Sequence, residues 1–150
     1  MRIALFEPDI PQNTGNIFRL GACLGIEVDI IEPTGYMFDD KRLKRSSMDY
    51  FDHIKYKRHL DWEAFYNWSK NKNYRLILLT TKSSKKYTNY SYQRNDILLF
   101  GRESAGVPKF VHDSAHEQLT IPMKKDLRSI NVSSAVALVV GEACRQLNLF

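Results

Sequence analysis

The chain has 150 residues, 43% of them hydrophobic, and a formal net charge of +5 with an isoelectric point near 9.2. This composition excludes a disordered chain and allows one domain with one hydrophobic core, which we assign to residues 1–150. No apolar run is long enough to cross a bilayer, and residues 1–7 are too short and too acidic for a signal peptide, so we expect a cytoplasmic protein. The basic charge favours an anionic partner, with nucleic acid ahead of a membrane surface.

Predicted strands and helices alternate along the chain. Apolar and β-branched runs predict strands at residues 2–7, 27–31, 54–56, 74–80, 96–100 and 118–121. Helical periodicity and capping residues predict helices at residues 13–24, 39–48, 61–70, 107–114 and 132–147, whereas the polar, tyrosine-rich residues 82–94 are expected to form a loop. Alternating elements with continuously apolar strands predict an α/β fold, a mostly parallel sheet with helices on both faces.

The last fifty residues contain the longest predicted helix. Residues 121–141 read IPMKKDLRSINVSSAVALVVG, which predicts a strand end, a loop and a helix whose N-cap is Asn131 or Ser129. The helix is apolar around most of its circumference, so we expect it to pack on the sheet and also on a second subunit. The polar loop at residues 124–129 precedes the helix, whose free backbone N–H groups are available to an acceptor there.

Several common catalytic and metal-binding signatures are absent from the chain. There is no G-x-G-x-x-G dinucleotide loop, no Walker A loop and no G-x-S-x-G nucleophile elbow. His112 and His116 stand four residues apart with no Cys or third His near them, which favours a solvated helix face over a metal site. Cys23 and Cys144 lie in apolar helical contexts, which indicates neither a disulfide framework nor a nucleophile.

Three segments remain as candidates for chemistry. Residues 13–19 read NTGNIFR, residues 98–108 read LLFGRESAGVP, and residues 121–141 form the third. Taken alone, the first segment is more simply explained as a glycine-containing helix start with an exposed arginine than as a site. The second is equally compatible with a loop that lets a ligand approach the backbone and with an ordinary strand-to-helix turn. All three lie at strand C-terminal ends or helix starts, where ligands bind on open α/β sheets.

Taken together and in this order, the segments resemble the SPOUT superfamily of RNA 2′-O-methyltransferases. The matching patterns are N-x-G-N-I-x-R, F-G-x-E-x-x-G-x-P, and I-P-M followed by S-x-N-x-S-x-A. The sequences EPDIPQNTGN at residues 7–16 and DDKRL at residues 39–43 are most similar to the short branch that methylates the wobble nucleotide of tRNA. The resemblance spans residues 2–147, which is nearly the whole chain.

This resemblance implies more than the residue patterns do. It implies a C-terminal trefoil knot, a homodimer, and S-adenosylmethionine as the methyl donor without a metal. The cofactor contacts that it implies are Leu79, Thr80, Gly101, Glu103, Ile121, Met123, Ser129 and Ser134. It also implies that the substrate is the ribose of nucleotide 34, cytidine or carboxymethylaminomethyluridine, in the anticodon loop of leucine tRNAs.

Methyl transfer to a ribose 2′-hydroxyl requires a positioned hydroxyl and help in removing its proton. By the resemblance, Arg19 is the catalytic arginine. Because a guanidinium is a poor base, we interpret Arg19 as fixing the target phosphate and ribose and stabilising the alkoxide. Asn13 is expected to orient Arg19, Asn131 and Ser129 to hold backbone or phosphate, and Glu103 to order the site.

Basic and aromatic clusters predict where RNA binds, although a solvated basic surface explains any single cluster equally well. The clusters are Lys41, Arg42, Lys44 and Arg45, then Lys55, Lys57 and Arg58, then Lys82, Lys85 and Lys86 with Tyr87, Tyr90 and Tyr92.

Two other classes of function stay open. A non-catalytic RNA-binding module would not bind the cofactor, and a small-molecule enzyme or structural protein would not bind RNA. A 2′-O-methyltransferase for another tRNA or ribosomal RNA position is a further alternative.

Overall fold

The structure is a computed structural model that describes residues 1–39 and 53–149. Its sheet contains six parallel strands in the order β3-β2-β1-β5-β4-β6, which confirms the predicted α/β fold. The strands are β1 (Arg2–Phe6), β2 (Val28–Ile31), β3 (Tyr56–His59), β4 (Arg75–Leu79), β5 (Asp96–Phe100) and β6 (Glu117–Leu119). The central strands β1 and β5 are buried along their whole length, as expected for a sheet covered on both faces.

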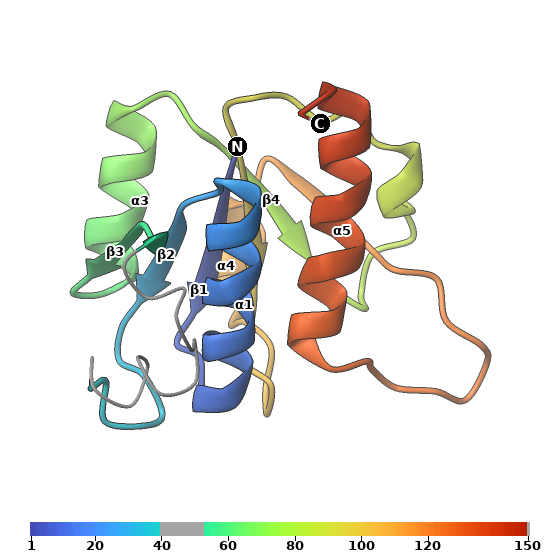
Figure 1. Cartoon of the computed structure of the whole chain (residues 1–150). Helices are drawn as coiled ribbons and strands as arrows, with labels where there is room; N and C mark the ends of the chain where they lie inside the picture. The colour runs from blue at the N-terminus through green and yellow to red at the C-terminus, as the bar shows by residue number, and fades with distance from the viewer. Residues whose placement is uncertain (40–52, 150) are drawn as a thin grey trace.

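Helices cover both faces of the sheet. α1 (Pro11–Leu24) and α5 (Val132–Leu147) lie side by side on one face, and α3 (Trp62–Asn71) and α4 (Lys109–Ser114) cover the other (Figure 1). The residues of β1 belong alternately to the two cores, one on each face of the sheet, because successive strand side chains point to opposite faces. Ile3 and Leu5 pack with α1 and α5, whereas Ala4 and Phe6 pack with α3 and α4.

Several element boundaries differ from the predicted ones for local reasons. α1 begins at Pro11, before the predicted start, because a proline suits the first helical turn, where its missing N–H is not needed. β3 extends to His59, beyond the predicted residues 54–56, and a short 3₁₀ helix, η2 (Tyr87–Asn89), lies within the expected loop. The predicted basic helix at residues 39–48 falls, from residue 40 on, outside the described residues.

α5 is buried on one side and exposed on the other. Asn131 is its N-cap, as one of the two alternatives predicted. The buried side packs against the sheet and α1 through Val136, Val139, Val140, Ala143 and Cys144. The other side exposes Ala137, Gly141 and Leu138, which is 47% exposed. An exposed leucine beside small residues is the apolar surface that the sequence predicts for a subunit contact.

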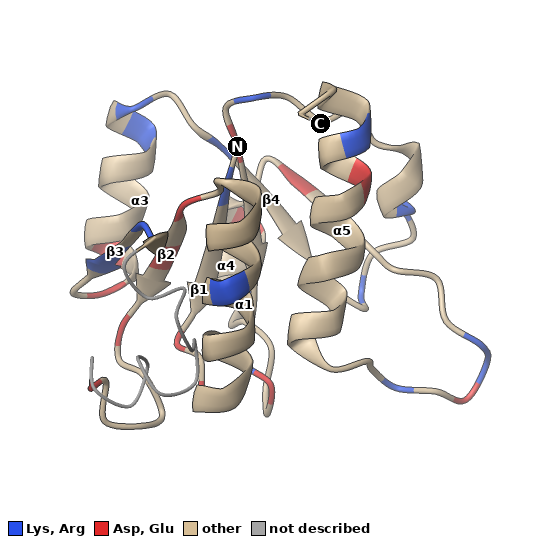
Figure 2. Cartoon of the chain, viewed as in Figure 1, with Lys and Arg blue, Asp and Glu red and all other residues tan. Residues whose placement is uncertain are grey.

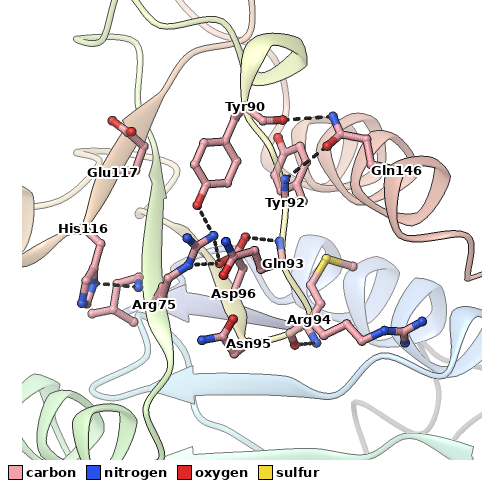
Figure 3. A network of polar contacts seen from close by, with 12 residues as sticks. Arg75, Tyr90, Tyr92, Gln93, Arg94, Asn95, Asp96, His116, Glu117 and Gln146 are labelled. Carbon is pink, nitrogen blue, oxygen red and sulfur yellow. Dashed lines mark hydrogen bonds and ion pairs between the residues drawn. The ribbon is translucent and has the colours of Figure 1, made fainter.

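The loop between β4 and β5 is tied both to the sheet and to α5 (Figure 3). Arg75 donates to the buried Asp96 carboxylate at 2.7 Å and to the Tyr90 hydroxyl at 2.5 Å. Gln146 of α5 donates to the Tyr90 carbonyl at 3.0 Å and accepts from the Tyr92 amide at 3.2 Å. This loop is therefore an ordered strap across α5. The trefoil knot implied by the resemblance stays a prediction.

Candidate active site

A cavity of about 470 Å³ lies at the C-terminal ends of β4, β5 and β6. This is the edge of a parallel sheet where ligands bind, and the volume is within the usual range for small-molecule sites. The walls come from residues 79–82, 100–103, 105–107, 120, 121, 123, 128–132 and 135, with Ile10 and Asn13 from the start of α1. Leu79, Phe100 and Ile121 supply apolar surface, which is typical of small-molecule pockets.

A line of hydrogen bonds joins the loop after β5, the start of α1 and the start of α5 beside this cavity. Glu103 Oε1 accepts from Asn13 Nδ2 at 3.0 Å, and Asn13 Oδ1 accepts from Asn131 Nδ2 at 2.9 Å. Asn131 Oδ1 then accepts from the Ser133 and Ser134 amides at 2.9 and 3.3 Å, which caps α5. An ionised carboxylate can only accept, so Glu103 fixes the orientation of both amides in the line. We call these three side chains the relay.

Asp9 contacts the relay from the far side of Glu103. Its amide donates to Glu103 Oε2 at 3.0 Å, and its Oδ1 accepts from the Glu103 amide at 3.2 Å, while the Ser104 hydroxyl donates to Oδ2. Burial, reinforced by the Asp9 carboxyl, raises the pKa of Glu103. The hydrogen bonds from the Glu103 side, followed by the one from Ser104, lower the pKa of Asp9. Asp9 therefore ionises first and Glu103 second.

Gly101 is constrained by its own loop. Arg102 and Gly106 exchange backbone hydrogen bonds of 3.0 and 2.9 Å, which folds residues 101–106 back on themselves. A Cβ at position 101 would lie 2.6 Å from the Gly106 carbonyl carbon, and no real Cβ approaches backbone so closely. The resemblance implies that Gly101 contacts the cofactor, and the structure adds a reason for a glycine here that requires no ligand.

Most of the predicted site residues line one cavity. Those brought together are Asn13, Leu79, Thr80, Gly101, Glu103, Ile121, Met123, Ser129 and Asn131. Two are not among the lining residues. Ser134 is exposed on α5, with its amide on the helix cap, and Arg19 lies on the exposed face of α1. Arg19 lies six positions after Asn13, which corresponds to a rise of about 9 Å along a helix.

Three groups of the site were not predicted from the sequence as part of the cavity or its hydrogen-bond network. Lys82 and Arg128 line the cavity and carry its positive charge together with Arg102, which is ion-paired with Glu7. The position of Lys82 just after the end of a predicted strand was the feature of the sequence that could have placed it in the cavity. Asp9 was quoted within a matching segment, but its contact with Glu103 joins residues 94 positions apart. No local pattern reveals such a contact.

Part of the predicted RNA surface is wrong. Tyr92 is only 6% exposed and packs in the core beneath α5, and its hydroxyl donates to the Tyr87 carbonyl at 2.9 Å. The Tyr92 ring is therefore not available to stack on a base, whereas Tyr90 is half-buried, with its hydroxyl accepting from Arg75. The four basic residues predicted at positions 41, 42, 44 and 45 lie outside the described residues.

Metal-binding groups and membrane helices are lacking in the described parts of the chain. Within residues 1–39 and 53–149, no three His, Cys, Asp or Glu side chains are grouped to hold a metal ion. His116 accepts from the Leu76 amide at 2.9 Å and lies beyond the end of α4, so the two histidines do not share one helix face as predicted. No helix in these same residues has both the length and the apolar character to span a membrane.

Comparison with known proteins gives one consistent picture. The SpoU rRNA Methylase family model matches residues 1–141. A tRNA (cytidine(34)-2′-O)-methyltransferase of Beijerinckia indica subsp. indica is 49% identical over 145 residues, which cover 97% of this chain and 91% of that protein. A solved structure on the 2-OH methylation of C/U34 on tRNA is 33% identical, with a TM-score of 0.92, and the match covers 98% of this chain and 95% of the other.

A more distant relative has been solved with AdoMet bound. The AdoMet-bound rRNA methyltransferase of Sinorhizobium meliloti is 25% identical with a TM-score of 0.87, and the match covers 97% of this chain and 56% of that one. The region matched by the family model contains the whole relay and every segment that lines the cavity. The chain therefore belongs to the SpoU methylase family.

Proposed function

We propose that the protein is an enzyme that methylates the 2′-hydroxyl of nucleotide 34 in the anticodon loop of tRNA. The observation that carries this proposal is the relay beside a cavity at the strand ends, in a chain closely related to a tRNA (cytidine(34)-2′-O)-methyltransferase. The finer proposal is that the substrates are leucine tRNAs with cytidine or carboxymethylaminomethyluridine at this position, and that the reaction takes place in the cytoplasm. An unpaired loop suits such an enzyme because its nucleotides can be splayed out.

The cavity fits S-adenosylmethionine in size and chemistry. Its apolar surface at Leu79, Phe100 and Ile121 suits the adenine ring, and the polar groups of Thr80 and Ser129 suit the ribose and the amino acid portion. When bound, this cofactor supplies a methyl group already activated by a sulfonium. The transfer therefore requires positioning of the ribose hydroxyl and acceptance of its proton, and no metal.

Each residue of the relay has its own role in positioning the site. Asn131 holds the first turn of α5 with its oxygen and Asn13 with its nitrogen, so the helix start and the cavity edge keep a fixed distance. Glu103 orders both asparagines, because its Oε1 accepts from Asn13 and its Oε2 is held by the Asp9 amide, so we assign it a positioning role and not that of a nucleophile. Arg19 would bind the target phosphate and stabilise the developing alkoxide.

We place the tRNA backbone over the loop between β6 and α5. This loop carries Lys124, Lys125 and Arg128 against a single acid, Asp126, and extends away from the sheet (Figure 2). Arg128 also lines the cavity, so the basic loop and the reaction site are continuous. Because phosphate contacts release counterions, binding should weaken steeply as salt is raised.

We also propose a homodimer in which Arg19 of one subunit serves the cavity of its partner. Arg19 is absent from the lining of its own cavity and lies on the exposed face of α1. The exposed Ala137, Leu138 and Gly141 lie on the neighbouring helix α5 and form the strip through which the subunits would pack. Residues of both helices would then complete each site.

Transfer of labelled methyl groups tests the proposed reaction. Purified protein, labelled S-adenosylmethionine and unmethylated leucine tRNAs are incubated, and the label is mapped by nuclease digestion and mass spectrometry. We expect label on the ribose of nucleotide 34 and none on a matched tRNA that already carries a 2′-O-methyl group there. Label only in another tRNA region or in ribosomal RNA would reassign the enzyme to a different target. Cofactor binding without any transfer would favour a non-catalytic role.

A further inference from the structure

Asp9 joins two loops that the sequence keeps far apart. β1 and β5 are neighbouring parallel strands, so the loops that follow them leave the sheet side by side. Asp9 in the first loop and Glu103 in the second exchange two hydrogen bonds, one in each direction, of 3.0 and 3.2 Å. The Ser104 hydroxyl and the ion pair between Arg102 and Glu7 add further links between the same loops.

We propose that Asp9 is a positioning residue for methyl transfer, which holds Glu103 so that the relay keeps its geometry. This inference rests on the proposed function. The Asp9 backbone amide donates to Glu103 Oε2, and this contact turns Oε1 toward Asn13. The Asp9 side chain completes this clasp by accepting from the Glu103 amide and from the Ser104 hydroxyl. Without these side-chain contacts, the loop that carries Glu103 is no longer held against the Asp9 amide, and the orientation of Asn13 and Asn131 is no longer fixed.

Gly35, in the loop after β2, packs directly against Asp9. Its amide donates to the Pro8 carbonyl at 2.9 Å, which brings the loop after β2 against the loop after β1. A Cβ at position 35 would lie 2.6 Å from the Asp9 Cβ and 2.9 Å from its Cα. An alanine at this position would therefore displace Asp9 without changing any group of the relay.

Asp9 also contributes charge to the surroundings of Glu103. The titratable groups that interact with this carboxyl are Asp9 and the Tyr36 hydroxyl, which donates to Thr14 at 2.7 Å, while the neighbouring Arg102 is ion-paired with Glu7. Burial is the largest cause of the raised pKa of Glu103, and Asp9 is the next. Removing the negative charge of Asp9 should therefore lower the pKa of Glu103.

Two variants of Asp9 separate its charge from its hydrogen bonds. Asp9→Asn keeps an oxygen for the Glu103 amide and removes the charge, so the acid limb of the kcat profile should move to lower pH. Asp9→Ala removes both acceptors, so kcat should fall roughly tenfold to a hundredfold at all pH values, with a smaller change in KM for tRNA. Gly35→Ala should reproduce the fall in kcat. Asp113→Asn, an exposed aspartate on α4, is the matched control and should match wild type.

An NMR titration of the Glu103 carboxyl gives a readout that does not depend on catalysis. The Glu103 pKa should be lower in Asp9→Asn than in wild type, even if the protein methylates some other substrate. An unchanged Glu103 titration in this variant would overturn the proposal, and so would wild-type kcat in Asp9→Ala. If the shift is observed but tRNA is not methylated, the clasp stands and the proposed function fails.

Discussion

Gly101 illustrates how one residue can be constrained by its own loop. A methyl group at this position would meet the Gly106 backbone at 2.6–2.9 Å. Because backbone cannot move aside as a side chain does, we predict that Gly101→Ala lowers the free energy of unfolding by roughly 1–3 kcal/mol. Denaturant unfolding followed by circular dichroism measures this change.

A control variant lies in the same loop. Ala105→Gly removes an exposed methyl group instead of adding one, and it should change stability by less than about 0.5 kcal/mol. Calorimetric titration of S-adenosylmethionine on both variants then separates two explanations. Wild-type stability with lost cofactor affinity in Gly101→Ala would mean that the glycine serves the approach of the ligand and not the closure of the loop.

The site residues differ in how far the sequence could predict them. Asn13, Glu103 and Asn131 each stand in a short recognisable pattern, and the structure brings all three into one line of hydrogen bonds. Asp9 escaped because its role depends on two loops that meet only after β1 and β5 pair. Arg19 is the opposite case, because a clear sequence pattern predicts it as a site residue but it does not line the cavity of its own chain.

At the scale of elements, Gln146 connects the strap at residues 90–92 to α5. Its side-chain amide satisfies the Tyr90 carbonyl and the Tyr92 amide at once, and it also donates to Glu142 at 2.7 Å. We predict that Gln146→Ala leaves these backbone groups without their partner and lowers the free energy of unfolding by about 1–3 kcal/mol. Hydrogen exchange should show faster exchange at the Tyr92 amide in particular.

The neighbouring Arg145 provides the control for this variant. It lies on the exposed side of α5 and contacts Glu142 within the same helix, without touching the strap. Arg145→Ala should leave exchange at the Tyr92 amide unchanged. Equal exchange at this amide in Gln146→Ala and wild type would mean that the core contacts of the Tyr92 ring hold the strap without the glutamine.

The elements themselves were largely predictable, and their order in the sheet was not. β5 begins and ends at the predicted residues 96 and 100, and α3 follows its predicted N-cap, Asp61, whose side chain accepts from the Ala64 amide. These features depend on local periodicity and capping. The placement of β5 between β1 and β4, and of Tyr92 beneath α5, depends on contacts between distant segments, which a single sequence does not encode locally.

The whole molecule is predicted to be a dimer that buries the exposed side of α5. Ala137→Glu would place a carboxylate in this apolar contact, where it has no partner to offset its loss of hydration. We expect light scattering at micromolar concentration to give the dimer mass for wild type and the monomer mass for this variant. Ala64→Glu makes the same change on the exposed side of α3 and should remain dimeric. A monomeric wild type would contradict the proposed assembly.

The shared site makes a stricter prediction, because two inactive proteins should restore activity when mixed. In a heterodimer of Arg19→Ala with Glu103→Gln, one cavity is intact in the first chain and receives its arginine from the second. Random exchange makes half of the dimers mixed, each with one working site, so activity should return to about a quarter of wild type. The control replaces the second protein with the Arg19→Ala, Glu103→Gln double variant, which has no arginine to supply. Recovery only with the single variant supports the shared site. Failure to recover after mass spectrometry has verified subunit exchange would place the catalytic arginine in its own chain's site.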